Sequence, residues 1–81
     1  SGLVTELSIF EPYTYEGGDV SIVLVQGEQT TTIYQGEDPW PDNSAATTFT
    51  IYGAAGQTEG TVQVLDWEGD ALESYAVSFA Q

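Results

Sequence analysis

The acidic side chains of one short segment are spaced so that they could bind a metal ion. In Asp66-Trp67-Glu68-Gly69-Asp70 three carboxylates alternate with other residues, and Glu73 follows. Carboxylate oxygens are the ligands that Ca²⁺ and Mg²⁺ prefer. The segment departs from the EF-hand pattern, which requires a Gly after the third acid and a Glu six residues further on. If the chain binds a cation, we expect these four acids to hold Ca²⁺; the alternative, a solvated polar turn, is the commoner origin of such a segment.

A second group of candidate binding residues lies in the longest irregular segment, residues 36–44. Trp40 stands there between two prolines, and an exposed Trp beside acids could stack on a sugar ring. Glu37-Asp38 and Asp42-Asn43 form another acidic cluster around it. The alternative for Trp40 is that it tucks under the loop and plugs one end of the fold, because large apolar side chains are more often buried.

The charge of the chain excludes most other chemistry. There are thirteen Asp and Glu and no Lys, Arg, His or Cys, which gives a formal net charge of −13. No His, Cys or Lys is present to act as base or nucleophile near neutral pH, and no transition-metal site of His or Cys ligands can form. Paired carboxylates alone need a substrate cleft, so we predict that the chain is not an enzyme. Nucleic acids and anionic membranes are excluded as partners because both require basic residues.

The elements that position these residues are predicted to be strands. The chain has 81 residues, of which 41% are hydrophobic, enough for a single domain spanning residues 1–81. Gly or Pro interrupts it every eight to twelve residues, the spacing of a β-sandwich or barrel. Residues 20–26 are apolar on both faces, which is typical of a central strand or of one covered by another chain. We predict an all-β, antiparallel sandwich of about six strands, at residues 3–10, 20–26, 30–34, 47–52, 61–67 and 74–80, with a short helical turn at 68–73 as an alternative.

The strand spacing, together with Tyr75-Ala76-Val77 near the end of the chain, resembles an immunoglobulin-like sandwich that lacks its cysteines. Such domains ordinarily have seven strands. Residues 1–10 resemble the donor strand of pilus-like fibre subunits, with residues 11–18 as its connection. The resemblance implies that Leu3, Thr5, Leu7 and Ile9 fill a groove on a neighbouring subunit. The alternative is that this strand pairs within its own domain.

Two classes of function follow from these observations. The first is a structural subunit of an extracellular or cell-surface filament, a head-to-tail homopolymer joined by donation of the N-terminal strand, with no catalytic site and no required cofactor. The second is a small carbohydrate- or calcium-binding module that uses Trp40 or residues 66–73. An acidic virion decoration protein and a designed sequence are further alternatives. No signal peptide is recognisable at the start of the chain, which leaves its location open.

Overall fold

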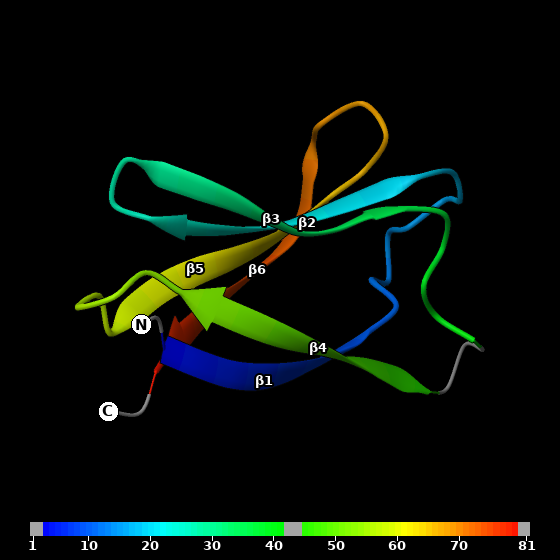
Figure 1. Ribbon diagram of the computed structural model, residues 1–81. Helices are drawn as coiled ribbons and strands as arrows, with labels where there is room; N and C mark the ends of the chain where they lie inside the picture. Colours follow the sequence, from blue (N-terminus) through cyan, green and yellow to red (C-terminus); the bar gives the residue numbers. More distant parts are fainter. Residues whose placement is uncertain (1–2, 42–44, 80–81) are drawn as a thin grey trace.

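Six antiparallel strands form two sheets that pack face to face. The computed structural model describes residues 3–41 and 45–79 (Figure 1). The described residues contain no helix that is long and apolar enough to span a membrane. The strands are β1 (Leu3–Phe10), β2 (Val20–Gln26), β3 (Gln29–Gly36), β4 (Ala46–Gly53), β5 (Glu59–Leu65) and β6 (Ala71–Ser78).

The sheets have the connectivity of an immunoglobulin-like sandwich from which strands are missing. One sheet contains only β1 and β4, and the other has the order β3-β2-β5-β6. If β1 is aligned with immunoglobulin strand B, the first sheet corresponds to B–E and the second to C′-C-F-G. Strands A and D, which would flank β1 and β4, have no counterpart among the described residues. The predicted small antiparallel β-sandwich is therefore confirmed.

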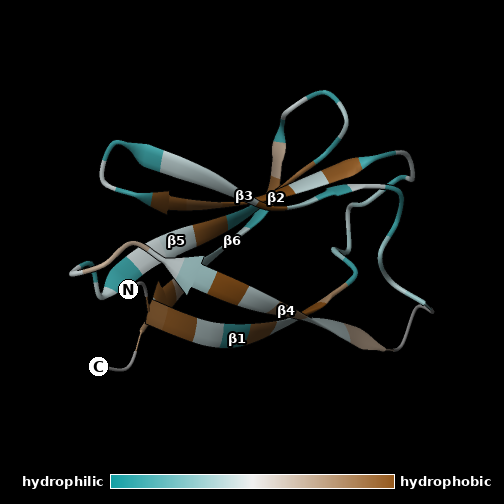
Figure 2. Ribbon diagram, in the orientation of Figure 1, coloured by the Kyte–Doolittle hydropathy of each residue, from teal (hydrophilic) through white to brown (hydrophobic). Residues whose placement is uncertain are grey.

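Alternating side chains build the core between the two sheets. Bands of apolar and polar residues alternate along β4 (Figure 2), whose Phe49 and Ile51 are buried while Thr50 between them is exposed. Each fully buried aliphatic side chain contributes about 1.5–3 kcal/mol. The buried apolar residues are Ile9, Val20, Ile22, Leu24, Trp40, Phe49, Ile51, Val62, Val64, Val77 and Phe79.

The position of β2 explains why both of its faces are apolar. This strand lies in the middle of the four-stranded sheet, between β3 and β5, and Val23 on its outer face is only 9% exposed. A bulge between Ile22 and Val23 shifts its register against β3. The two-sided apolarity thus belongs to a central strand and does not require a cover from another chain.

One polar side chain is buried at the end of β2. Gln26 is 5% exposed, and its amide nitrogen donates to the carbonyls of Gln57 and Glu59 at 3.3 and 3.2 Å. Its amide oxygen accepts the backbone N–H of Ala54 at 3.0 Å. Because a buried polar group is costly unless it is hydrogen-bonded, this side chain fixes the connection between β4 and β5.

The last two strands differ from their predicted limits. β5 ends at Leu65, two residues early, and β6 begins at Ala71, three residues before the predicted start. Residue 80, the predicted end of the last strand, lies outside the described residues. The alternative of a helical turn at 68–73 is wrong, because residues 71–73 belong to a strand. Both strand limits differ from the prediction because residues 66–70 form a tight turn, which is held by Asp66.

Candidate functional site

The turn at residues 66–70, here called the acidic turn, is held by hydrogen bonds to Asp66. One carboxylate oxygen of Asp66 accepts the backbone N–H groups of Glu68 and Asp70, each at 2.9 Å. The Asp66 backbone is also bonded to Gly69 and Asp70. Gly69 has a φ of 89°, a conformation that side chains other than glycine rarely adopt. Asp66 therefore has a structural role as an Asx-type turn former.

The acidic turn brings together three of the four predicted metal ligands. Oxygens of Asp66, Glu68 and Asp70 lie within 4.8 Å of one another, and Glu68 and Asp70 are exposed. Ca²⁺ takes six to eight oxygen ligands, so the remaining ones would come from water. Such a site would resemble weakly binding calcium sites, which have a Kd of about 10⁻⁴–10⁻³ M.

The fourth predicted ligand, Glu73, lies elsewhere. It sits on β6 opposite Val64, and its carboxylate accepts a hydrogen bond from the hydroxyl of Tyr75. Glu73 is therefore separated from the other three acids, because β6 begins at Ala71, between the acidic turn and Glu73. Tyr75 lies on the last strand and bonds to a side chain, so it does not play the part of the immunoglobulin tyrosine, which bonds to upstream backbone.

Tyr75 should make the stability of the fold sensitive to alkaline pH. Burial, followed by the hydrogen bond and the charge of Glu73, raises the pKa of Tyr75 from 10.0 to about 12. As the pH rises above 10, the unfolded chain loses this proton while the folded chain keeps it, so the free energy of unfolding should fall between pH 10 and about 12. The sequence has no Lys, Arg or Cys, so among side chains only tyrosines titrate there.

The measurement is urea denaturation at pH 9 to 12, with Tyr75→Phe as the comparison. The variant should lose less stability over this range than the parent chain. Equal slopes for the two proteins would contradict the prediction.

Trp40 is buried and offers no face to a sugar. It is 5% exposed, and its indole N–H donates to the Ile9 carbonyl at 2.8 Å. Its ring lies edge-on to Tyr15, with centroids 5.6 Å apart. The prediction of a stacking platform is corrected accordingly: Trp40 fills one end of the sandwich, as the alternative anticipated.

Trp67 is the exposed tryptophan, and it was not singled out from the sequence. It belongs to the acidic turn and is 70% exposed. Its ring lies against Gly18, where an added Cβ would come within 3.1 Å of Trp67 Cδ1. Trp67 was overlooked because it was predicted to be the last residue of a strand, and not part of a turn. The acids at 66, 68 and 70 were the available signal for a turn.

The second acidic cluster borders a small hollow. Asp19, Glu37 and Asp38 line about 280 Å³ together with Tyr15 and two glycines. Burial, and then the negative charges of Asp38, Glu11 and Asp19, raise the pKa of Tyr15. Asp38 also accepts the Trp40 backbone N–H at 2.8 Å. Asp42 and Asn43 of this cluster lie outside the described part of the chain.

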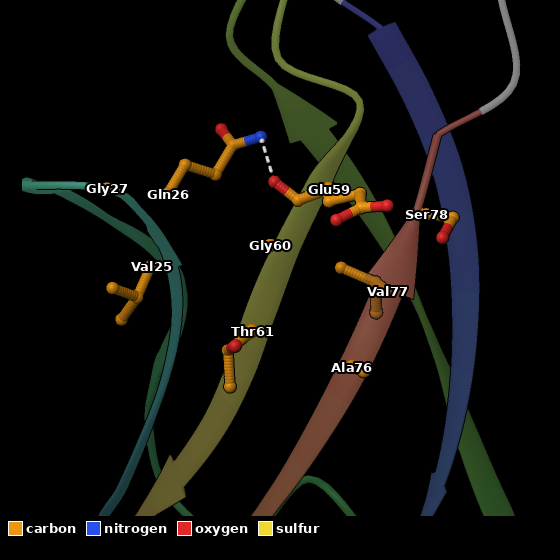
Figure 3. Close-up of a pocket in the computed structure, with 9 residues that line it drawn as sticks. All are labelled: Val25, Gln26, Gly27, Glu59, Gly60, Thr61, Ala76, Val77 and Ser78. Carbon is orange, nitrogen blue, oxygen red and sulfur yellow. Dashed lines mark hydrogen bonds between the residues drawn. The ribbon is translucent and has the colours of Figure 1, made fainter.

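Another shallow hollow, of about 490 Å³, lies at one end of the four-stranded sheet (Figure 3). It is lined by residues 25–27, 59–61 and 76–78. Glu59 is its only acid. The hollow therefore offers no pair of carboxylates for acid–base catalysis.

The four predicted interface residues line the inner face of β1. Ile9 is buried, whereas Leu3, Thr5 and Leu7 are half-buried. The strand pairs along its whole length with β4 of the same chain, from Leu3 opposite Gly53 to Phe10 opposite Ala46. This is the pairing that the intramolecular alternative expects. Donation of residues 1–10 would require β1 to leave β4, and it stays a prediction; residues 1–2 lie outside the described range.

Comparisons of the chain with protein-family models, with curated proteins and with solved structures return no match.

Proposed function

We propose that the chain is a structural subunit of an extracellular filament or surface assembly whose copies are joined through the N-terminal strand β1. The observation that carries the proposal is the two-stranded β1–β4 sheet, in which β1 pairs only with β4 and leaves its other edge without a partner among the described strands. An unpaired edge is a template for a strand from another chain. Neither β1 nor β4 contains a proline that would block such pairing.

The side chains beside this open edge support the proposal. β4 is the strand of the two-stranded sheet that approaches β2 and β3, so β1 lies on the side of β5 and β6 (Figures 1 and 3). Leu3, Thr5 and Leu7 on the inner face of β1 are only half-buried, and so are Glu73 and Tyr75 on β6. An immunoglobulin-like sheet has strand A at this place. A strand contributed by another copy of the chain would cover these half-buried side chains.

The test of this proposal is the mass of the native particle, measured by sedimentation over a range of protein and NaCl concentrations. Salt screens the repulsion between copies of charge −13, so the particle should grow as NaCl rises. Particles larger than a dimer support a filament or layer. A monomer at every protein and salt concentration overturns the proposal.

A calcium-binding module is the second candidate function, favoured by the proximity of the three carboxylates in the acidic turn. We expect Ca²⁺ to raise the melting temperature more than Mg²⁺ at equal concentration, because a flexible oxygen site favours the larger ion. With a Kd of about 1 mM, about 10 mM Ca²⁺ would add about 1.4 kcal/mol.

Asp70→Asn should abolish the difference between the two ions while leaving the backbone bond to Asp66 in place. Glu59→Gln, which removes the same charge outside the turn, should retain it. Equal stabilisation by both ions in the parent chain would leave general screening as the only effect.

A further inference from the structure

The outer face of the β1–β4 sheet carries most of the large apolar side chains that the described residues expose. Val4, Phe10 and Tyr52 are 52%, 60% and 68% exposed, and they alternate along the two strands with residues that face the core. Tyr13, which is fully exposed, follows β1. Tyr13 and Trp67 lie outside the two strands of this sheet. Val4 and Tyr52 face each other at one end of this sheet and Phe10 lies at the other end, and exposed apolar patches mark interaction surfaces.

The same face is nearly free of charge. Among the 16 residues of β1 and β4 the only acid is Glu6, although the whole chain contains thirteen. Two copies of this protein repel each other wherever their acids meet, and neither has a cation to offset that repulsion. They can approach most readily through this sheet, whereas a basic partner would be drawn to the acidic loops. The occupant that fits the surface is a second copy.

We propose that two copies pair antiparallel through the free edges of β1, about a twofold axis at Leu7. This inference rests on the proposed function and specifies the contact. Facing residues of an antiparallel pair project on the same side of the sheet, so two central registers are available. One sets Glu6 opposite the partner's Glu6, which is destabilising because like charges face each other. The other sets Leu7 opposite the partner's Leu7.

The register centred on Leu7 accounts for the exposed side chains at both ends of β1. It places Val4 opposite the partner's Phe10, twice in the dimer. Tyr52, which faces Val4 within the chain, extends this apolar row. Glu6 then faces the partner's Ser8, and the half-buried Leu7 is covered at the axis. The result is a continuous sheet of order β4-β1-β1-β4; because a twofold contact closes on itself, a filament needs a second contact.

A lysine at position 8 tests the register directly. Ser8→Lys should form two ion pairs with the partner's Glu6 and tighten the dimer by about two- to thirty-fold at low salt. Thr50→Lys is the matched control, because Thr50 faces Glu6 of its own chain and the added charge is the same. Ser8→Ala corrects for the lost hydroxyl, which is 2.7 Å from that of Thr48.

Phe10→Glu tests the apolar row. It should weaken the dimer by about tenfold or more, whereas Tyr13→Glu, which adds the same charge just beyond β1, should change it much less. Val4→Lys combined with Phe10→Glu should restore association at low salt, because each lysine would face the partner's glutamate.

The dimer constant is measured by sedimentation equilibrium, with circular dichroism to verify folding. If Ser8→Lys and Thr50→Lys change the dimer constant equally, this contact is overturned but the assembly proposal is not. The same holds if the chain forms particles larger than a dimer and Phe10→Glu does not disrupt them. A dimer whose constant responds to these substitutions, but that never forms larger particles, supports the contact and overturns the filament. A monomer under all conditions overturns both.

Discussion

Replacing Trp40 with alanine is expected to lower the free energy of unfolding by about 3–5 kcal/mol. The side chain is 5% exposed, so its truncation leaves a cavity at the end of the sandwich. It also removes the donor to the Ile9 carbonyl and the edge-on contact with Tyr15. A domain of this size has about 5–10 kcal/mol in total, so the variant should be close to unfolding at 37 °C. Urea denaturation with tryptophan fluorescence measures the loss.

The second tryptophan provides the matched control. Trp67→Ala removes an indole that is 70% exposed, and it should cost no more than about 1 kcal/mol. Trp40→Phe keeps most of the buried volume but loses the indole N–H. Its loss of unfolding free energy should therefore lie between those of Trp40→Ala and Trp67→Ala. If Trp40→Ala retained full stability, Trp40 would not be the plug that its contacts indicate.

The sequence was sufficient to predict β1 and β4 because their side chains alternate. Polar and apolar residues have a period of two along β1 and β4, and the one-sided burial of both strands follows from it. The two-sided apolarity of β2 also predicted a central strand, and β3 and β5 flank it. Gly27, with a φ of 61°, lies in the tight turn between β2 and β3.

The candidate sites were harder to predict because they depend on specific contacts that leave no periodic pattern in the sequence. The carboxylate of Asp66 bonds to backbone two and four residues away, and this turn exposes Trp67 and separates Glu73 from the other acids. Gln26 lies in a strand between turn residues, and its partners are about thirty positions away. No local pattern distinguishes it from the exposed Gln35 on β3.

The charge of the chain and its open sheet edge bear on function together. Natural sheets often protect an edge with lysine or proline, yet the chain has no lysine and β1 has no proline. Glu6 is the only charge on that strand, and the acids elsewhere keep copies apart at low salt. An edge of this kind is suited to association that ionic strength controls.

Replacing Gln26 with glutamate is expected to destabilise the fold by about 3–5 kcal/mol at neutral pH. The substitution hardly changes the volume, but it turns the group that donates to the Gln57 and Glu59 carbonyls into an acceptor. The new charge would be buried, facing two carbonyl oxygens, in a chain with no cation to neutralise it. Chemical denaturation at pH 7.5 measures this loss against the parent chain.

The pH dependence of this variant identifies the cause. Burial raises the pKa of the introduced carboxyl in the folded state above its unfolded value of about 4.3. The folded protein then binds the proton more tightly than the unfolded chain, so the deficit should shrink as the pH is lowered from 7.5 to 4.5. When protonated, the carboxyl can again donate to one carbonyl. Gln35→Glu, the same change at an exposed position, should cost little at either pH. A deficit in Gln26→Glu that is constant with pH would show that lost packing, and not buried charge, destabilises the variant.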